Sequence, residues 1–410
     1  GKLIYGHHAR YTGIPTTDFI RVDYYYFLSE FIDYYDQFNE IIDKYKIDFT
    51  VQTERQFIPM AVLNGVALKK KLSVFSNVGT TNISVKKGYG IDNIFENRYQ
   101  YDTEIIKKLS IEKKKEDLKK IGNNYIEERF LDKNKAILDV DFERNKLFKL
   151  LKKENKKMVS DYKKSEICNL FDWDEKKPIG AIFSNDLTDG IFDIKTRVFL
   201  DNYLWLRITI EEASKNKDIN WIIKPHPNEI KNDVKLTTQN LVQKMRLPNH
   251  VRLLPSEYAS KSLPKIINVL FTNHGSAGYE YVAVGIPVVT AAEAVYSNLN
   301  ISIEAKSKEE YFEIIKNSHK IDRPNEKSIE NAKLFAYAFT QLTRISFPIV
   351  SDDFQFQSCY SELYWKEFEK VFDIFDKENK GKLENDIFYK SLLYQITNNN
   401  KHTLNIKELE

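Results

Sequence analysis

The chain has 410 residues and a mass of 48.2 kDa, a size that corresponds to about two or three domains. Hydrophobic residues make up 42% of it and charged residues 30%, which is enough apolar material for buried cores and excludes a wholly disordered protein. The 62 Lys and Arg residues nearly balance the 59 Asp and Glu residues, so the net charge of +3 gives no indication of a nucleic acid partner.

The cysteines and the apolar runs indicate a reducing compartment and no membrane span. Cys168 and Cys359 are too few for a disulfide framework or a thiolate metal site, which predicts a cytoplasmic protein. No apolar run reaches the roughly 18–20 residues that a transmembrane helix needs. The chain opens Gly-Lys-Leu without an initiator Met or a signal-peptide pattern, as a truncated N-terminus would.

Residues 1–100 have the pattern of a mixed α/β domain. A short strand is expected at 3–5, and apolar residues at helical spacing predict an amphipathic helix over 24–45. The next predicted elements are a strand at 47–51, a helix at 58–70 and a strand at 72–75. Strand, helix and strand in that order predict a parallel βαβ unit, so we assign residues 1–100 to an N-terminal Rossmann-like domain.

Residues 101–170 differ from the rest in their excess of lysine. Between residues 107 and 157 there are 17 Lys and Arg residues against 10 Asp and Glu residues, with Leu and Ile recurring among them at helical spacing. One interpretation is a solvated helical insertion that links two domains. The other is a cationic face that lies against anionic lipid at the inner membrane, or that receives a charged acceptor.

Residues 171–345 show the clearest alternation of short strands and helices. The predicted strands are 180–184, 221–223, 251–254, 269–272 and 285–290. Helices are predicted over 199–213 and from Tyr279 onward. This alternation is typical of a doubly wound parallel sheet, so we assign the segment to a second Rossmann-like domain.

The last part of the chain is predicted to be mainly helical. Its best helical stretches are 308–318, 326–342 and 360–375. We assign residues 346–410 to C-terminal helices that pack back on the N-terminal domain.

The sequence predicts no metal site. Residues 376–387 have the length of an EF-hand loop, but Lys380 and Ile387 stand where oxygen ligands belong. His7 and His8 have no carboxylate or Cys at ligand spacing.

The segment Lys224-Pro225-His226-Pro227 follows a predicted strand. Two prolines restrict the backbone around His226, so the imidazole is held at the strand end with little conformational entropy left to lose. An imidazole beside Lys224 suits a phosphate or diphosphate. A rigid loop with a surface histidine is the alternative.

A second loop, Asn273-His274-Gly275-Ser276-Ala277-Gly278, leads from a predicted strand into a helix. Small residues there expose backbone amides at the positive end of the helix, which favours phosphate binding. Ser276 could cap the helix and donate to phosphate, and Glu280 would lie near a ribose. The alternative is an ordinary capped helix whose glycines serve close packing.

Four carboxylates are candidates for contact with an acceptor hydroxyl. Asp186 and Asp189 follow the predicted strand 180–184 and either hold such a hydroxyl or cap the next helix. Asp18 and Glu54 are the N-terminal carboxylates expected in loops at strand ends, where one of them could act as a catalytic base.

Together these motifs resemble the glycosyltransferases of capsule and surface polysaccharide biosynthesis, including the bacterial Kdo transferases of capsule assembly. The residues that carry the resemblance span roughly residues 10–300: Gly13-Ile14-Pro15 with Asp18 and Arg21, Ile182 to Asp189, Ile223 to Pro227, His274 to Glu280, and Gly285 to Val289 with Tyr296.

The resemblance implies a GT-B-like α/β fold with two Rossmann-like domains facing a cleft. It implies that Lys224 and His226 contact the donor phosphate, that Gly275, Ser276 and Ala277 bind phosphate at the helix start, and that Glu280 lies near the ribose. His274, where other members often carry a different polar residue, is a further candidate for phosphate binding. Asp18 or Glu54 would supply the catalytic carboxylate, and Arg21 would help to bind the acceptor.

The expected function is transfer of a sugar from a nucleotide sugar to a growing surface glycan or glycolipid, without a metal or other cofactor. The nucleotide (CMP, CDP, UDP or GDP) stays open. The alternatives are a polyol-phosphate transferase of teichoic-acid type with a CDP-activated donor, a sugar-nucleotide epimerase, and a non-catalytic subunit of glycan assembly.

Overall fold

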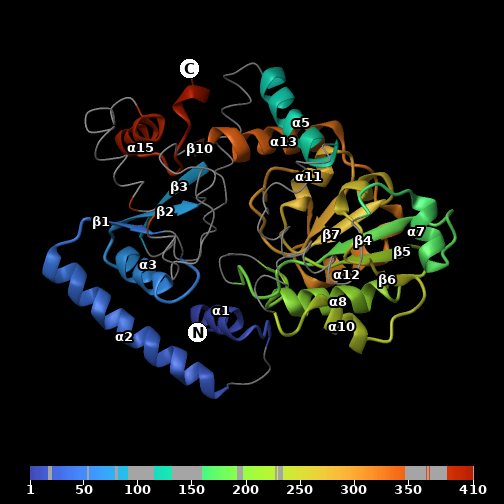
Figure 1. The fold of residues 1–410 in the computed structure, drawn as a ribbon, viewed down its shortest axis with the longest axis horizontal. Helices are drawn as coiled ribbons and strands as arrows, with labels where there is room; N and C mark the ends of the chain where they lie inside the picture. Colours follow the sequence, from blue (N-terminus) through green and yellow to red (C-terminus); the bar gives the residue numbers. More distant parts are fainter. Residues whose placement is uncertain are drawn as a thin grey trace. The chain divides into compact units, whose positions relative to one another are not determined.

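The structure is a computed structural model, and it divides the chain into two compact units. It describes residues 1–16, 21–52, 55–78, 82–90, 115–131, 159–191, 197–226, 229, 234–346, 366, 369 and 386–409. The first unit comprises residues 1–33, 56–58 and 95–336, and the second comprises residues 34–55, 59–94 and 337–410 (Figure 1).

A six-stranded parallel sheet forms the centre of the first unit. In sheet order its strands are β6 (Val251–Leu253), β5 (Asn220–Lys224), β4 (Ile179–Phe183), β7 (Val269–Thr272), β8 (Val288–Thr290) and β9 (Ile303–Glu304). The chain starts in the middle at β4, runs outward to β6, returns to β7 beside β4 and runs outward again. This is the doubly wound order of Rossmann folds, in which ligands bind outside the carboxyl ends of the two middle strands.

The middle strands β4 and β7 consist mainly of apolar residues, which explains why they lie at the centre of the sheet. β7 is buried at all four positions, as is expected for a strand covered on both faces by helices. Trp221 of β5 and Phe271 of β7 contact each other edge to face, with 5.4 Å between ring centroids. Figure 1 shows α8 (Asn202–Ala213) and α12 (Lys308–Lys316) on one face of the sheet and α11 (Ala277–Ala283) on the other.

The predicted elements of this region are confirmed, with shifts of a few residues at their ends. The remaining helices of the unit are α7 (Lys164–Phe171), α10 (Thr238–Lys244), the 3-10 helices η2 (Ser260–Lys265) and η3 (Ser318–Lys320), and α13 (Glu326–Tyr337), which ends at the boundary with the second unit.

The predicted strand at 3–5 is wrong, because these residues belong to helix α1 (Lys2–Thr12). Ile4, His7 and His8 are buried and follow the spacing of one helical face, which outweighs the local apolar run Leu3-Ile4-Tyr5. The Tyr5 hydroxyl donates to Asp201 (2.8 Å), which joins α1 to the start of α8 within the first unit.

The second unit has a four-stranded mixed sheet in the order β1 (Phe49–Gln52), β2 (Ser73–Val78), β3 (Asn82–Tyr89), β10 (Ile345–Ser346). β1 and β2 are parallel and joined by α3 (Met60–Lys69), so the predicted βαβ unit is confirmed. β3 returns antiparallel to β2, a hairpin that the sequence analysis did not predict.

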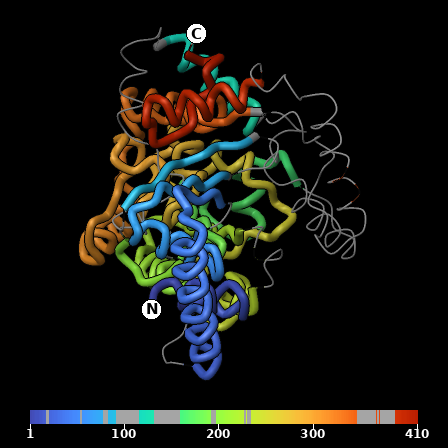
Figure 2. Tube along the Cα trace, turned by 90° about the vertical axis from the view of Figure 1, so that its left-hand side faces the viewer, coloured from blue at the N-terminus to red at the C-terminus, as the bar shows by residue number. Residues whose placement is uncertain are grey.

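Two further parts of the second unit are helical. The predicted helix over 24–45 is confirmed as α2 (Val22–Tyr45), one continuous helix that begins in the first unit (Figure 2). At the other end of the chain lie α15 (Ile387–Thr397), the π-helix η4 (Ala338–Leu342) and the 3-10 helix η6 (Ile406–Glu408). The C-terminal segment contacts β3, since the Thr403 amide donates to the Val85 carbonyl (2.9 Å).

The structure describes one helix of the lysine-rich segment, α5 (Lys115–Leu131), within the first unit. It packs closely on α13, because a Cβ added to Gly122 would lie 1.9 Å from the Lys333 carbonyl oxygen. Apart from residues 366 and 369, the predicted helix at 360–375 lies outside the described residues, as do residues 376–385.

Candidate functional site

The loops that follow the two middle strands, β4 and β7, are hydrogen-bonded to each other. The Asn185 side-chain oxygen accepts from the Asn273 amide (3.2 Å) and from the Thr272 hydroxyl (3.4 Å). Both loops lie where the strand order of the sheet reverses, which is the place where doubly wound sheets bind ligands. The candidate site is therefore built around these loops and the end of β5.

His226, at the end of β5, is anchored through its backbone. Its amide donates to the Ser184 hydroxyl at 2.7 Å, and that hydroxyl donates in turn to Glu229 at 3.3 Å. Ser184 directly follows β4, so the hydrogen bond ties the loop after β5 to the middle of the sheet. The imidazole is partly exposed, so it can reach a ligand from a fixed backbone.

Glu229 is a buried carboxyl group behind the loop that carries His226. It is 5% exposed, and it accepts from the Thr238 amide (2.9 Å) and from the Thr238 hydroxyl. Burial raises the pKa of Glu229 to about 7, and the negative charge of Asp186 adds to the rise. Glu229 therefore titrates close to neutral pH, within one hydrogen bond of Ser184.

His274, after β7, is held by Asn202 at the start of α8. The Asn202 side-chain oxygen lies 3.3 Å from His274 Nε2 and accepts from the Asn273 side chain at 2.8 Å. The Asn202 amide nitrogen donates to the carbonyls of Asp186 (2.9 Å) and Asp189 (3.2 Å). Because the Asn202 oxygen is an acceptor, His274 Nε2 carries the proton in this arrangement.

The electrostatic surroundings keep His274 neutral. Burial lowers the pKa of His274 to about 3, and the positive charges of Arg197 and His226 lower it further. The loops that carry the two histidines are held by adjacent residues, since Ser184 accepts from the His226 amide and Asn185 accepts from the Asn273 amide. The one proton of neutral His274 is engaged with Asn202, so Nδ1 is left as an acceptor.

The Lys224 side chain points toward the loop that follows β6. Its ammonium donates to the Tyr258 carbonyl at 2.7 Å. Burial lowers the pKa of Lys224 to about 8, while the carboxylate of Glu257 opposes the fall. Contact of Lys224 with a phosphate stays a prediction.

The turn at the start of α11 is shaped by Tyr296. The Tyr296 hydroxyl donates to the Gly275 carbonyl at 2.8 Å, and a Cβ added to Gly278 would lie 1.7 Å from that hydroxyl. The close-packing interpretation of Gly278 is therefore confirmed. Ser276 stands at the N-cap position without a capping hydrogen bond, so the prediction that it caps the helix is wrong.

The same turn leaves Ser276 exposed, with Ala277 beside it as the first residue of α11. The Gly275 amide donates to the Thr272 hydroxyl at 3.3 Å, so it already has an acceptor. Phosphate contact by Gly275, Ser276 and Ala277 stays a prediction.

Glu280 is buried and paired with a cation from the lysine-rich segment. Arg129 Nε lies 3.3 Å from both carboxylate oxygens of Glu280, which is 5% exposed. The rings of Phe130 and Tyr281 also meet edge to face, at 5.4 Å. Contact of Glu280 with a ribose stays a prediction.

The two aspartates after β4 order their own loop. Asp186 accepts from the amide (3.0 Å) and the hydroxyl (3.1 Å) of Thr188, and Asp189 accepts from the Gly190 amide (3.1 Å). The N-cap of α8 is Asp201, which accepts from the Leu204 amide. The alternative in which Asp186 or Asp189 caps the next helix is therefore wrong.

The predicted acceptor side is described in part. Asp18 and Glu54 lie outside the described residues, as does Pro227. Arg21 Nε lies 3.3 Å from Asp23, so its guanidinium has a carboxylate partner within the first unit. A role for these residues in acceptor binding or catalysis stays a prediction.

Neither a metal-ligand cluster nor a membrane-spanning helix occurs among the described residues. In the ranges given above, no group of three or more His, Cys, Asp or Glu side chains could hold a metal ion. Within those same ranges, no helix is both long and apolar enough to cross a membrane.

The sequence analysis missed three residues that organise this site: Ser184 as a hydrogen-bond link, Asn202 and Glu229. Asn202 follows the helix-capping residue Asp201, and Glu229 comes three residues after His226, so both stand beside recognisable signals. Asn273, the partner of Asn202, lies 71 residues away along the chain, and Thr238, the partner of Glu229, lies 9 residues away. No local pattern identifies the pairing of Asn202 with Asn273.

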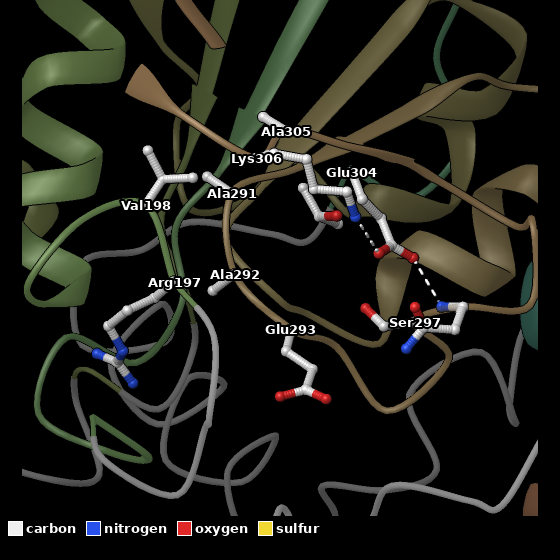
Figure 3. Close-up of a pocket in the computed structure, with 11 residues that line it drawn as sticks. Arg197, Val198, Ala291, Ala292, Glu293, Ser297, Glu304, Ala305 and Lys306 are labelled. Carbon is white, nitrogen blue, oxygen red and sulfur yellow. Dashed lines mark hydrogen bonds and ion pairs between the residues drawn. The ribbon is translucent and has the colours of Figure 1, made fainter. Parts of the chain in front are cut away.

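A cavity of about 100 Å³ lies at the ends of β8 and β9, next to this site. Figure 3 shows Arg197, Glu293, Glu304 and Lys306 around it. Its floor is joined to the loop after β7, since the Ala291 and Ala292 amides donate to the Asn273 carbonyl at 3.2 and 3.0 Å.

Comparisons with known proteins find distant matches among solved structures. No family model and no curated protein matches the chain. Among solved structures, the beta Kdo 2,7 transferase of KpsC from Thermosulfurimonas dismutans is 13% identical, with a TM-score of 0.40, and the match covers 83% of this chain and 89% of that one. The beta Kdo 2,4 transferase of the same KpsC is 12% identical, with a TM-score of 0.38, covering 69% and 78%.

A UDP-GlcNAc 2-epimerase from Neisseria meningitidis bound to UDP-GlcNAc is 13% identical, with a TM-score of 0.26, covering 75% and 80%. Kdo transferases are also the proteins that the sequence motifs resemble. The α/β fold class predicted from the sequence is confirmed by the two sheets themselves.

Proposed function

We propose that the protein is a glycosyltransferase that moves a sugar from a nucleotide sugar to a surface glycan. The first unit would bind the donor at the carboxyl ends of β4, β5 and β7. The observation that carries this proposal is that two adjacent residues after β4 hold the loops of His226 and His274: the Ser184 hydroxyl accepts from the His226 amide at 2.7 Å, and the Asn185 side chain accepts from the Asn273 amide at 3.2 Å.

Charge stabilisation is the chemical basis of the proposed reaction. Negative charge develops on the nucleotide phosphate as the bond to the sugar breaks, and fixed donors aimed at that charge lower the barrier. His226 would donate from the anchored loop after β5. His274, whose proton is engaged with Asn202, would border the phosphate in the loop after β7 without donating to it. The Ser276 hydroxyl and the Ala277 amide would add donors at the start of α11.

Pre-organisation supports this role. The backbone of His226 is held by Ser184, and the ring of His274 lies 3.3 Å from Asn202, which itself bonds three other residues of the site. Groups that are fixed before the ligand arrives lose little entropy when they bind it. The acceptor hydroxyl would need a base, for which Asp18 and Glu54 are the proposed residues.

The test is a thermal-shift panel with CMP, CDP, UDP and GDP, followed by nucleotide release from the matching nucleotide sugar. The proposal predicts a raised thermal midpoint with one nucleotide, by the linkage between binding and stability. It also predicts release that depends on an added glycan acceptor. A panel without any shift would contradict the proposal and favour a non-catalytic subunit.

Two enzymatic alternatives give different results in the same assay. A polyol-phosphate transferase would release CMP from a CDP-linked polyol and leave nucleotide sugars intact. An epimerase would convert the nucleotide sugar without any acceptor.

A further inference from the structure

The cavity beside His274 contains charged side chains of both signs. Arg197 and Lys306 contribute two positive charges, and Glu293 and Glu304 contribute two negative ones. The formal charges cancel, so the cavity is poorly suited to a phosphate or another free anion. Within the lining residues Glu304 already bonds Lys306 (3.3 Å), which makes the pair a poor cation site as well.

The lining suits a ring that bears hydroxyl groups. Each hydroxyl can donate to a carboxylate and accept from a guanidinium or an ammonium, so neighbouring hydroxyls use both kinds of lining group. Ala291 and Ala292 provide small side chains on the floor, and none of the described residues that line the cavity is an aromatic on which a base could stack.

Glu304 is fixed in place before any ligand binds. One of its oxygens accepts from the Asn298 amide at 2.9 Å and the other from the Lys306 ammonium, as the dashed lines in Figure 3 show. Glu304 is the last residue of β9, so strand geometry positions its carboxylate. A fixed acceptor costs little entropy on binding.

The cavity borders the loop that carries His274. Its floor residues Ala291 and Ala292 both bond the Asn273 carbonyl, one residue before His274. Arg197, which also lines the cavity, pairs with Ala292 in an antiparallel bridge. A ring joined to a phosphate bound at this loop would therefore lie within reach of the cavity.

We propose that this cavity binds the hydroxyl-bearing ring attached to the donor phosphate, with Glu293 and Glu304 as acceptors and Arg197 and Lys306 as donors. The inference rests on the proposed function. The same chemistry is offered by the ribose of the nucleotide and by the sugar to be transferred, so the experiment includes one arm for each.

The experiment measures dissociation constants by calorimetry for Glu293→Gln and Lys306→Met. The probes are CMP, CDP, UDP and GDP, which carry ribose alone, and UDP-glucose, GDP-mannose and CMP-N-acetylneuraminate, which also carry a sugar. Glu313→Gln and Lys316→Met are matched controls, because they form a similar Glu–Lys pair (3.3 Å) on the exposed side of α12 outside the cavity. Thermal midpoints without ligand establish that each variant is folded.

We expect the dissociation constant of the probe that binds best to rise about tenfold in the cavity variants and to stay unchanged in the controls. A rise for free nucleotide as well as nucleotide sugar assigns the cavity to ribose, and a rise for nucleotide sugar alone assigns it to the transferred sugar. Folded cavity variants that bind every probe like the controls would overturn this inference and leave the proposed function standing. Wild-type protein that binds no probe would overturn both.

Discussion

The Ser184 hydroxyl accepts a 2.7 Å hydrogen bond from the backbone nitrogen of His226 and so connects the ends of two neighbouring strands. Ser184 is 4% exposed, so no solvent replaces this hydroxyl when it is removed. The bond gives His226 a fixed backbone position, and its loss should lower both the stability of the protein and its turnover.

Ser184→Ala is expected to lower the free energy of unfolding by about 1–3 kcal/mol, because it leaves the buried His226 amide without its acceptor. Turnover of the nucleotide sugar should fall about tenfold as His226 loses its position. Urea denaturation and initial rates measure the two effects. Ser214→Ala is the control, since its hydroxyl bonds the Ile210 carbonyl within α8; similar rates in both variants would contradict the positioning role.

His226→Ala is expected to lower turnover about 100-fold or more, because it removes a donor to the phosphate as charge develops there. The thermal midpoint should hardly change, since the ring is partly exposed. His319→Ala is the control, because His319 lies on η3 beside Asp218. Equal turnover in His226→Ala and wild type would remove this residue from the mechanism.

Glu229 should make stability depend on pH near neutrality. Its pKa is about 7 in the folded protein against 4.5 in the reference state, so the folded state binds more protons between these values and stability falls as pH rises through them. Relative to that of Glu229→Gln, the free energy of unfolding of the wild type should fall by about 3 kcal/mol between pH 4.5 and pH 7.5.

Chemical denaturation of both proteins across this range measures the difference. Taking the difference cancels the opposite contribution of His274, whose lowered pKa makes stability rise with pH up to about 6.5. A difference that stays constant with pH would show that Glu229 is not buried as the structure has it.

Gly278→Ala is expected to destabilise the protein by about 1–3 kcal/mol, because the new methyl group would displace the buried Tyr296 ring and break its bond to Gly275. Ser276→Ala, two residues away, should leave the thermal midpoint unchanged, because Ser276 makes no capping bond. Ser276→Ala should still weaken nucleotide binding about fivefold through the lost phosphate donor. A large fall in the thermal midpoint of Ser276→Ala would contradict the geometry of the turn before α11.

Sequence periodicity was sufficient for the sheet of the first unit. β4, β5, β7 and β8 are short apolar runs bounded by polar loops, and such runs identify buried strands independently of their neighbours. α1 was predicted wrongly because three adjacent apolar residues look like a strand until burial of Ile4, His7 and His8 on one face is known.

For the site, the sequence identified the residues at strand ends and missed the bonds between them. His226 and His274 stand in loops with unusual composition, so local patterns were enough to identify them. The Asn202–Asn273 bond joins residues 71 positions apart, and the Ser184–His226 bond joins residues 42 positions apart. Such pairings depend on strand order, which periodicity does not contain.

An NMR titration tests directly whether His226 and His274 border the same ligand, using protein labelled with 15N in the rings of its seven histidines. Assignments come from single His→Ala variants, and the titrant is the nucleotide that gives the largest thermal shift. We expect the signals of His226 and His274 to move together with a single dissociation constant, while those of His250, His319 and His402 stay in place. Saturable binding that leaves both His226 and His274 unmoved would contradict this expectation.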